Sequence, residues 1–178
     1  MSADMTELIE CLTAKQQAIV ARWRDAIIRT YPEDTAKFLK TKQDRFSNPV
    51  GHSIATESEA IFQKLLAGGE IADCAQSIDN IVRIRAVQDL TAAQATSFIY
   101  LLKDVIVEVL REQLQQPEVS RELHAFNRKI DQLALLTFDT YMHCRDQVHQ
   151  IRAGEKRKWG LQSNGAQLRV LNDKEKRE

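Results

Sequence analysis

A chain of 178 residues, of which 43% are hydrophobic and 28% charged, is long enough to bury the core of one ordinary globular domain. Its 25 lysines and arginines balance 25 aspartates and glutamates, so the net charge gives no reason to expect nucleic acid or an acidic substrate as the partner. Acidic residues are in slight excess over residues 1–153 and basic residues over residues 154–178.

Apolar residues recur at helical spacing along most of the chain, whereas the alternating runs typical of strands are nearly absent. This periodicity predicts five main helices, over about residues 6–30, 52–67, 71–87, 92–115 and from 118 to at least 153. A short helical turn at Phe38 and Leu39 is expected to pack the loop between the first and second helices against the rest of the protein. We therefore predict an all-α antiparallel helical bundle of about five helices, with a long C-terminal helix that extends beyond the bundle.

Residues with special backbone preferences mark the predicted helix ends. Pro32 ends the first helix, because the residue before a proline is disfavoured in the helical region. The pair Gly68–Gly69 ends the second helix as a C-terminal cap. Thr91, with Gln94 three residues later, predicts a capping box at the start of the fourth helix.

The chain is expected to divide into a helical domain over residues 5–153 and a basic flexible tail over residues 154–178, where small polar residues and glycines become frequent. Three basic side chains precede Trp159, a pattern that suits a lipid or nucleic-acid surface. Three are few for such a surface, so a solvated helix end is the favoured interpretation.

The three cysteines are odd in number and far apart in the sequence, which argues against a disulfide framework and against a structural zinc site. The first residues do not form a secretory leader, and Lys103 and Asp104 interrupt the longest apolar stretch, so no membrane span is expected. We therefore expect a cytoplasmic protein.

Catalytic signatures are absent from the sequence: there is no nucleophile elbow, phosphate loop or dinucleotide-binding glycine set, so we predict no catalytic residues and no enzyme. Asp139, His143 and Asp146 share one helical face at metal-ligand spacing, with His149 just beyond. A solvated face is the favoured interpretation, because no second helix rich in histidine and glutamate completes a metal shell. We predict no metal and no cofactor.

A haem site would need a histidine inside an apolar pocket. His52, His124 and His143 are each interpreted as surface or partly buried side chains, because that is the commoner environment of histidine. The neighbouring Met142 and Cys144 are interpreted as packing residues.

Several polar residues interrupt or flank apolar runs and are the candidate site residues: Arg45, Asn48, Arg83, Arg85, Gln88 and Asp89. Two interpretations compete. The arginines could form an anion or signal pocket, because a guanidinium matches carboxylate and phosphate groups. They could instead belong to a polar network that fixes how the helices pack, and this second interpretation is favoured. Arg85 and Gln88 would then lock the angle between the third and fourth helices.

Four blocks of the sequence resemble the RsbRD N-terminal domain family of bacterial general stress regulation, in whose multidomain members this domain precedes an output domain such as a STAS domain or a DNA-binding segment. They are Arg45–Gly51, Ile81–Asp89, Leu101–Lys103 and Phe138–Arg145. The resemblance covers roughly residues 5–153 and implies an all-helical regulatory input domain. About 25 residues remain beyond it, too few for a STAS output domain, so the chain resembles a stand-alone input domain.

The function that this resemblance implies is non-enzymatic: a bacterial signalling input domain that acts as a sensor or adaptor through contacts with a protein partner, with self-association into a homodimer or other homo-oligomer. The alternative is a sensor that binds a small ligand or haem, with Arg45, Asn48, Arg85 and Gln88 or a histidine holding it. Neither nucleic acid nor a membrane is an expected partner.

Overall fold

The computed structural model describes residues 6–41, 46–88 and 90–175, with side chains as far as residue 154 except at residue 41, and regular structure in these ranges is entirely helical. The elements, in chain order, are α1 (Thr6–Ala14), α2 (Gln16–Arg29), α3 (Glu33–Thr41), α4 (Pro49–Leu66), the 3-10 turn η1 (Ile71–Cys74), α5 (Ala75–Ala86), α6 (Ala92–Thr96), η2 (Ser97–Ile99), α7 (Leu101–Val109), η3 (Gln113–Gln115) and α8 (Pro117–Glu175). The predicted all-α fold class is confirmed.

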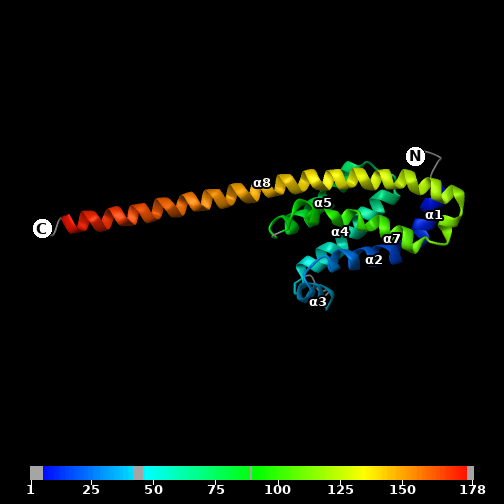
Figure 1. The fold of residues 1–178 in the computed structure, drawn as a ribbon, viewed down its shortest axis with the longest axis horizontal. Coiled ribbons are helices and arrows are strands. Elements are labelled where there is room, and N and C mark those ends of the chain that lie inside the picture. The colour runs from blue at the N-terminus through cyan, green and yellow to red at the C-terminus, as the bar shows by residue number, and fades with distance from the viewer. Residues whose placement is uncertain (1–5, 42–45, 89, 176–178) are drawn as a thin grey trace.

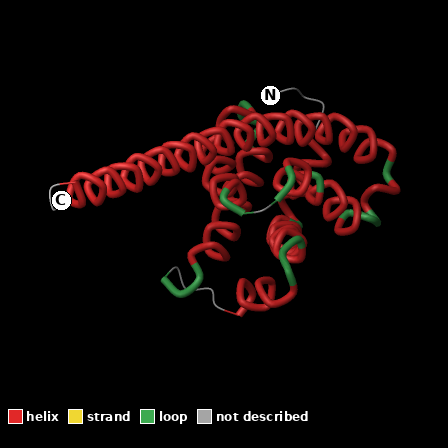
Figure 2. The backbone as a smooth tube through the Cα atoms, turned by 60° about the vertical axis from the view of Figure 1, so that its left-hand side comes forward, coloured by secondary structure: helices red, strands yellow, loops and turns green. Residues whose placement is uncertain are grey.

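The helices stack in layers beneath α8 (Figure 1). α5 packs along α8, α4 packs on α5, and α2 packs on both α4 and α7. α3 lies at the far edge, where it contacts α2 and α4. Both Figure 1 and Figure 2 show α8 extending well past the rest of the molecule. Its 59 residues span about 90 Å at a helical rise of about 1.5 Å per residue.

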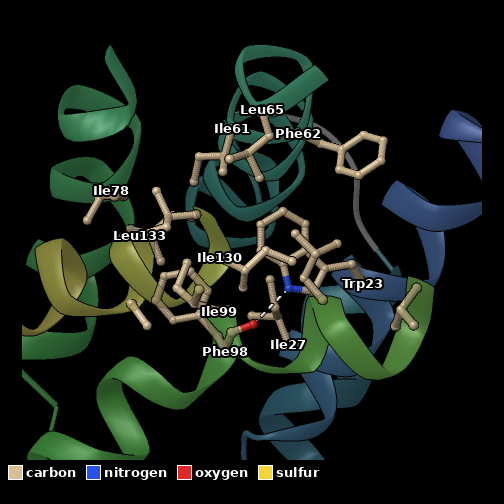
Figure 3. Packing of buried hydrophobic residues seen from close by; sticks show 14 of the residues in the cluster. Trp23, Ile27, Ile61, Phe62, Leu65, Ile78, Phe98, Ile99, Ile130 and Leu133 are labelled. Carbon is tan, nitrogen blue, oxygen red and sulfur yellow. Dashed lines mark hydrogen bonds between the residues drawn. The ribbon is translucent and has the colours of Figure 1, made fainter. Parts of the chain in front are cut away.

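One continuous core joins these layers (Figure 3). Trp23 lies at its centre with no exposed surface, and its indole N–H donates to the carbonyl oxygen of Phe98 at 2.8 Å. α4 supplies Ile61, Phe62 and Leu65 to this cluster, and α8 supplies Ile130 and Leu133. The fully buried members drawn around Trp23 are Ile27, Ile61, Phe62, Ile78, Phe98, Ile99, Ile130 and Leu133, with Leu65 nearly buried beside them.

Helix ends that depend on short-range signals lie where we predict them. α4 ends at Leu66, two residues before Gly68, whose φ of 71° is a left-handed conformation that glycine adopts without strain. Thr91 and Gln94 form the predicted capping box at the start of α6. The predicted turn at Phe38 and Leu39 is a full helix, α3, of which Leu39 is buried and Phe38 is half exposed.

The prediction of an unbroken first helix over residues 6–30 is wrong at Lys15, which separates α1 from α2 with φ −105° and ψ 8°. Just before this break, the Thr13 hydroxyl donates to the carbonyl oxygen of Ile9 at 2.7 Å. Such back-bonding bends a helix, because the hydroxyl competes for a carbonyl that the backbone also uses.

The predicted fourth helix over residues 92–115 is also interrupted, by η2 and again after Val109. Side chains capture the carbonyl groups at the first interruption. Arg85 Nη2 donates to the carbonyl oxygen of Gln94 at 3.0 Å, and the Trp23 indole N–H donates to the carbonyl oxygen of Phe98. An α-helix needs those carbonyls for the amides four residues later, so the chain tightens into a 3-10 turn instead.

The predicted boundary between residues 153 and 154 does not coincide with a helix end, because α8 continues to Glu175. The division into a helical domain and a flexible tail therefore stays a prediction. Within the ranges described, we find no helix that is both long enough and apolar enough to span a bilayer.

Candidate functional site

Arg85 lies at a junction of three elements. Its side chain is 1% exposed, and its Nη2 donates to the hydroxyl of Thr30 at 3.1 Å and to the carbonyl oxygen of Gln94 at 3.0 Å. The guanidinium carbon lies 5.1 Å from the ring centre of Tyr31 and 5.6 Å from that of Phe98. Arg85 thus joins the end of α5 to the end of α2 and to α6.

The electrostatics of this junction are unusual, because none of the described carboxylates forms an ion pair with Arg85. Burial lowers the pKa of the Arg85 guanidinium, and the nearby Tyr31 hydroxyl partly opposes that change. Two guanidinium nitrogens, Nε and Nη1, and the Tyr31 hydroxyl oxygen are buried without a well-formed hydrogen bond. These atoms have almost no surface open to water, so the junction is closed, and this geometry favours a packing role over a ligand pocket.

Arg83 is separated from Arg85 by about 200° around the helix axis and faces solvent. Its Nε lies 2.6 Å from Asp79 Oδ2, the ion pair that the four-residue spacing predicts. Hydrogen bonding to Asp79 is the main cause that raises the pKa of Arg83. Asp79 also accepts from the Cys144 thiol of α8, at 3.8 Å. The two arginines therefore do not form one pocket.

Asn48 joins α3 to α4 at the proline corner. Its Nδ2 donates to the carbonyl oxygen of Leu39 at 2.9 Å, while its Oδ1 caps α4 by accepting from the Gly51 N–H at 2.8 Å. A Cβ atom on Gly51 would lie 2.2 Å from Asn48 Nδ2, so this corner requires glycine. Arg45, the predicted partner of Asn48, lies outside the described residues.

The remaining candidates, Gln88 and Asp89, follow α5 in the sequence. The Gln88 side-chain oxygen is buried without a hydrogen-bond partner, so no described contact shows it locking the helix angle. Asp89 lies outside the described residues. The described contacts do not bring the six candidate residues together, either as a ligand pocket or as a single network. Their role stays a prediction.

α8 holds this same turn through two side chains that our sequence analysis does not single out as site residues. The Tyr141 hydroxyl donates to the carbonyl oxygen of Leu90 at 3.0 Å, and Arg145 Nη1 donates to that of Ala86 at 3.1 Å. A cation there also complements the C-terminal dipole of α5. The four-residue spacing of Tyr141 and Arg145, which places both on one helix face, was the available signal.

The outer face of α8 carries a second feature, which we name the outer stripe: Leu135, Phe138 and Met142. These side chains are 66%, 44% and 41% exposed, although their neighbours Leu133 and Tyr141 are buried against the bundle. Our interpretation of Met142 as a packing residue is therefore wrong, because it lies on the opposite side of α8 from the core. Cys144 is buried, as we predict. The spacing of i, i+3 and i+7 defines one helix face.

Groups that could bind metal or act as nucleophiles are placed unfavourably for such chemistry. Among the described side chains, no cluster of histidine, cysteine, aspartate or glutamate could hold a metal ion. All four histidines are exposed, so none offers an axial haem ligand inside an apolar pocket. Burial is the main cause that raises the pKa of the Cys74 and Cys144 thiols, which disfavours the reactive thiolate.

These observations define a class of protein: an all-α domain whose buried polar groups join helices and whose most conspicuous surface is an apolar helix face. The chain belongs to the family of the RsbT co-antagonist protein rsbRD N-terminal domain, whose model matches residues 17–155. The match includes all four resembling blocks and points to a regulatory domain of stress signalling. No curated protein and no solved structure matches the chain.

Proposed function

We propose that this protein is a non-enzymatic input domain of a bacterial stress-signalling system, which works in the cytoplasm as an adaptor or sensor by binding a protein partner. Family membership supports the regulatory role. The observation that carries the protein-binding role is the outer stripe.

Three large apolar side chains on one solvent-facing helix surface are unusual for a helix whose other side is already buried. Exposed side chains of this kind do not stabilise the isolated domain, because they gain nothing from the core on the far side of α8. Contiguous exposed apolar surface commonly marks a site of protein interaction. The stripe also lies beside Tyr141 and Arg145, so a partner bound there would contact the helix that holds the α5–α6 turn.

A second part of the proposal is self-association along α8 beyond the bundle. Tyr141 and Cys144 are buried, and the same side of the helix continues through Val148, which is half-buried, and Ile151, which is 62% exposed. The spacing of three, four and three residues is that of a coiled-coil seam. A second copy of α8 would cover Val148 and Ile151, the part of this side that the bundle leaves at least partly open.

The experiment compares Leu135→Glu with Gln132→Glu, another exposed position on α8 that receives the same charge. Each variant replaces the native gene, and a transcriptional reporter of the general stress response is measured together with the melting curve of the purified protein. We expect Leu135→Glu to alter the reporter response while Gln132→Glu does not, and both to melt like the native protein.

A normal reporter response in folded Leu135→Glu would contradict the role of the outer stripe. An early melting transition in Leu135→Glu alone would also contradict it, because the side chain would then be part of the fold.

A further inference from the structure

We propose that the cleft between α2, α3 and α4 binds a small amphipathic carboxylate, a molecule with a short apolar body and one carboxylate group. The cleft has a volume of about 290 Å³. None of its lining residues belongs to the closed junction at Arg85. Pockets for small molecules begin at about 300 Å³, so the occupant is small.

The apolar part of the cleft is formed by Ile28, Leu39 and Ala55, of which the first two are buried. Gly51 completes this wall. The Asn48 side chain occupies the space where a Cβ of Gly51 would lie, so no larger residue fits at this position of the wall. Ile28 and Leu39 leave little surface in water, so a hydrocarbon body would mainly cover Ala55 and the aliphatic parts of Arg24 and Lys40.

The polar part of the cleft carries an excess of positive charge. Arg24 and Lys40 line it together with a single acid, Asp25, and His52 adds an imidazole ring. Arg24 Nε lies 3.9 Å from Asp25 Oδ1, at the limit of an ion pair, and both side chains are about one-third or more exposed. Among the described residues, neither Lys40 nor His52 forms an ion pair. One carboxylate would supply the missing negative charge, and the nearby start of α4 adds a favourable dipole.

The combination of both parts selects the class of ligand. Inorganic phosphate would satisfy the cations but leave the apolar wall in contact with water, whereas a neutral hydrocarbon would leave the cations unpaired. Occupancy would also strengthen the docking of α3 on α4, because Leu39 lines the cleft and its carbonyl oxygen accepts from Asn48. This inference does not depend on the outer stripe, which lies on α8.

The test is an NMR titration of the full chain with hexanoate, and in parallel with the neutral hexanamide. We expect hexanoate to shift the backbone amides of Gly51, His52 and Ala55, with a dissociation constant in the millimolar range. Hexanamide should bind about tenfold more weakly, because it cannot pair with the cations. Acetate at the same concentration controls for ionic strength, since it carries the charge without the apolar body.

Lys40→Gln and Arg24→Gln should each weaken hexanoate binding by about fivefold. Lys37→Gln is the matched control, because Lys37 also lies on α3 but pairs with Glu33 and does not line the cleft. No shift of the cleft amides with hexanoate, equal shifts with acetate or hexanamide, or an equal loss in Lys37→Gln would each overturn the proposal. None of these results would alter the outcome of the stress-reporter experiment, so the two proposals fail separately.

Discussion

At the scale of single residues, Arg85 raises the question of what stabilises a buried guanidinium that has no ion pair with a described carboxylate. Removing a charged group from water costs several kcal/mol unless hydrogen bonds or opposite charge replace the hydration. Here Thr30 and Gln94 supply two acceptors, and the faces of Tyr31 and Phe98 supply negative electrostatic potential. Arg85 therefore stabilises the fold by joining helices rather than by neutralising an acid.

We predict that Arg85→Ala lowers the free energy of unfolding by about 2–4 kcal/mol, because it opens a cavity and leaves the Gln94 carbonyl without this donor. Urea denaturation measures the loss. Arg85→Met, which fills the space without a charge, should recover part of it. The hexanoate titration should be unchanged in both variants, since Arg85 does not line the cleft. An unchanged melting curve in Arg85→Ala would show that this residue is not structural.

The importance of Arg85 could be predicted from its place in an apolar run, because a buried polar group needs partners. Its partners could not, since Thr30 is 55 residues away and only the folded chain brings the two together. The outer stripe was missed for a different reason. Periodicity groups apolar residues on helix faces, but only the packed structure shows which face of α8 lies against the bundle.

At the scale of elements, the chain separates two kinds of helix end. The ends at Gly68 and Thr91 depend on residues within a single turn, so the sequence was sufficient to predict them. The interruption between α6 and α7 depends on donors from α2 and α5, namely Trp23 and Arg85. Propensity and periodicity contain no information about such distant donors, and for this reason one predicted helix proved to be several.

This account predicts that Trp23→Phe loses about 1–2 kcal/mol of stability, because it removes the indole donor while keeping an aromatic ring in the core. Amide hydrogen exchange measures where the loss falls. We expect the amides of residues 97–102 to exchange faster, since the carbonyl of Phe98 loses its remote donor, while those of α4 change little. A uniform acceleration across the domain would show that the hydrogen bond does not control the local geometry.

At the scale of the whole molecule, the contacts that join α8 to the bundle lie towards its start. The Glu122 carboxylate accepts from the Leu8 N–H at 2.7 Å, and the last described side-chain bond from α8 to the bundle is made by Arg145. The end of α8 thus lies beyond the part of the chain that closes the core (Figure 1).

We predict that a chain truncated after Ala153 keeps its melting temperature within about 2 °C, because α8 keeps the contacts with the bundle that it makes from Glu122 to Arg145. Self-association should also be retained, since all the residues of the proposed seam between two copies of α8 precede the cut. Calorimetry and light scattering measure the two quantities. A truncated chain that melts without cooperativity would show that the last residues belong to the folded domain.

The continuity of α8 has a mechanical consequence. Tyr141 and Arg145, which donate hydrogen bonds to the α5–α6 connection, lie on the same helix as the residues that project from the molecule. No linker separates the two parts of this helix. About 45 Å of helix follow Arg145, at about 1.5 Å per residue. Acting as a rigid lever, this segment would move its far end by about 4 Å for a tilt of about 5° at the turn, roughly the width of a side chain.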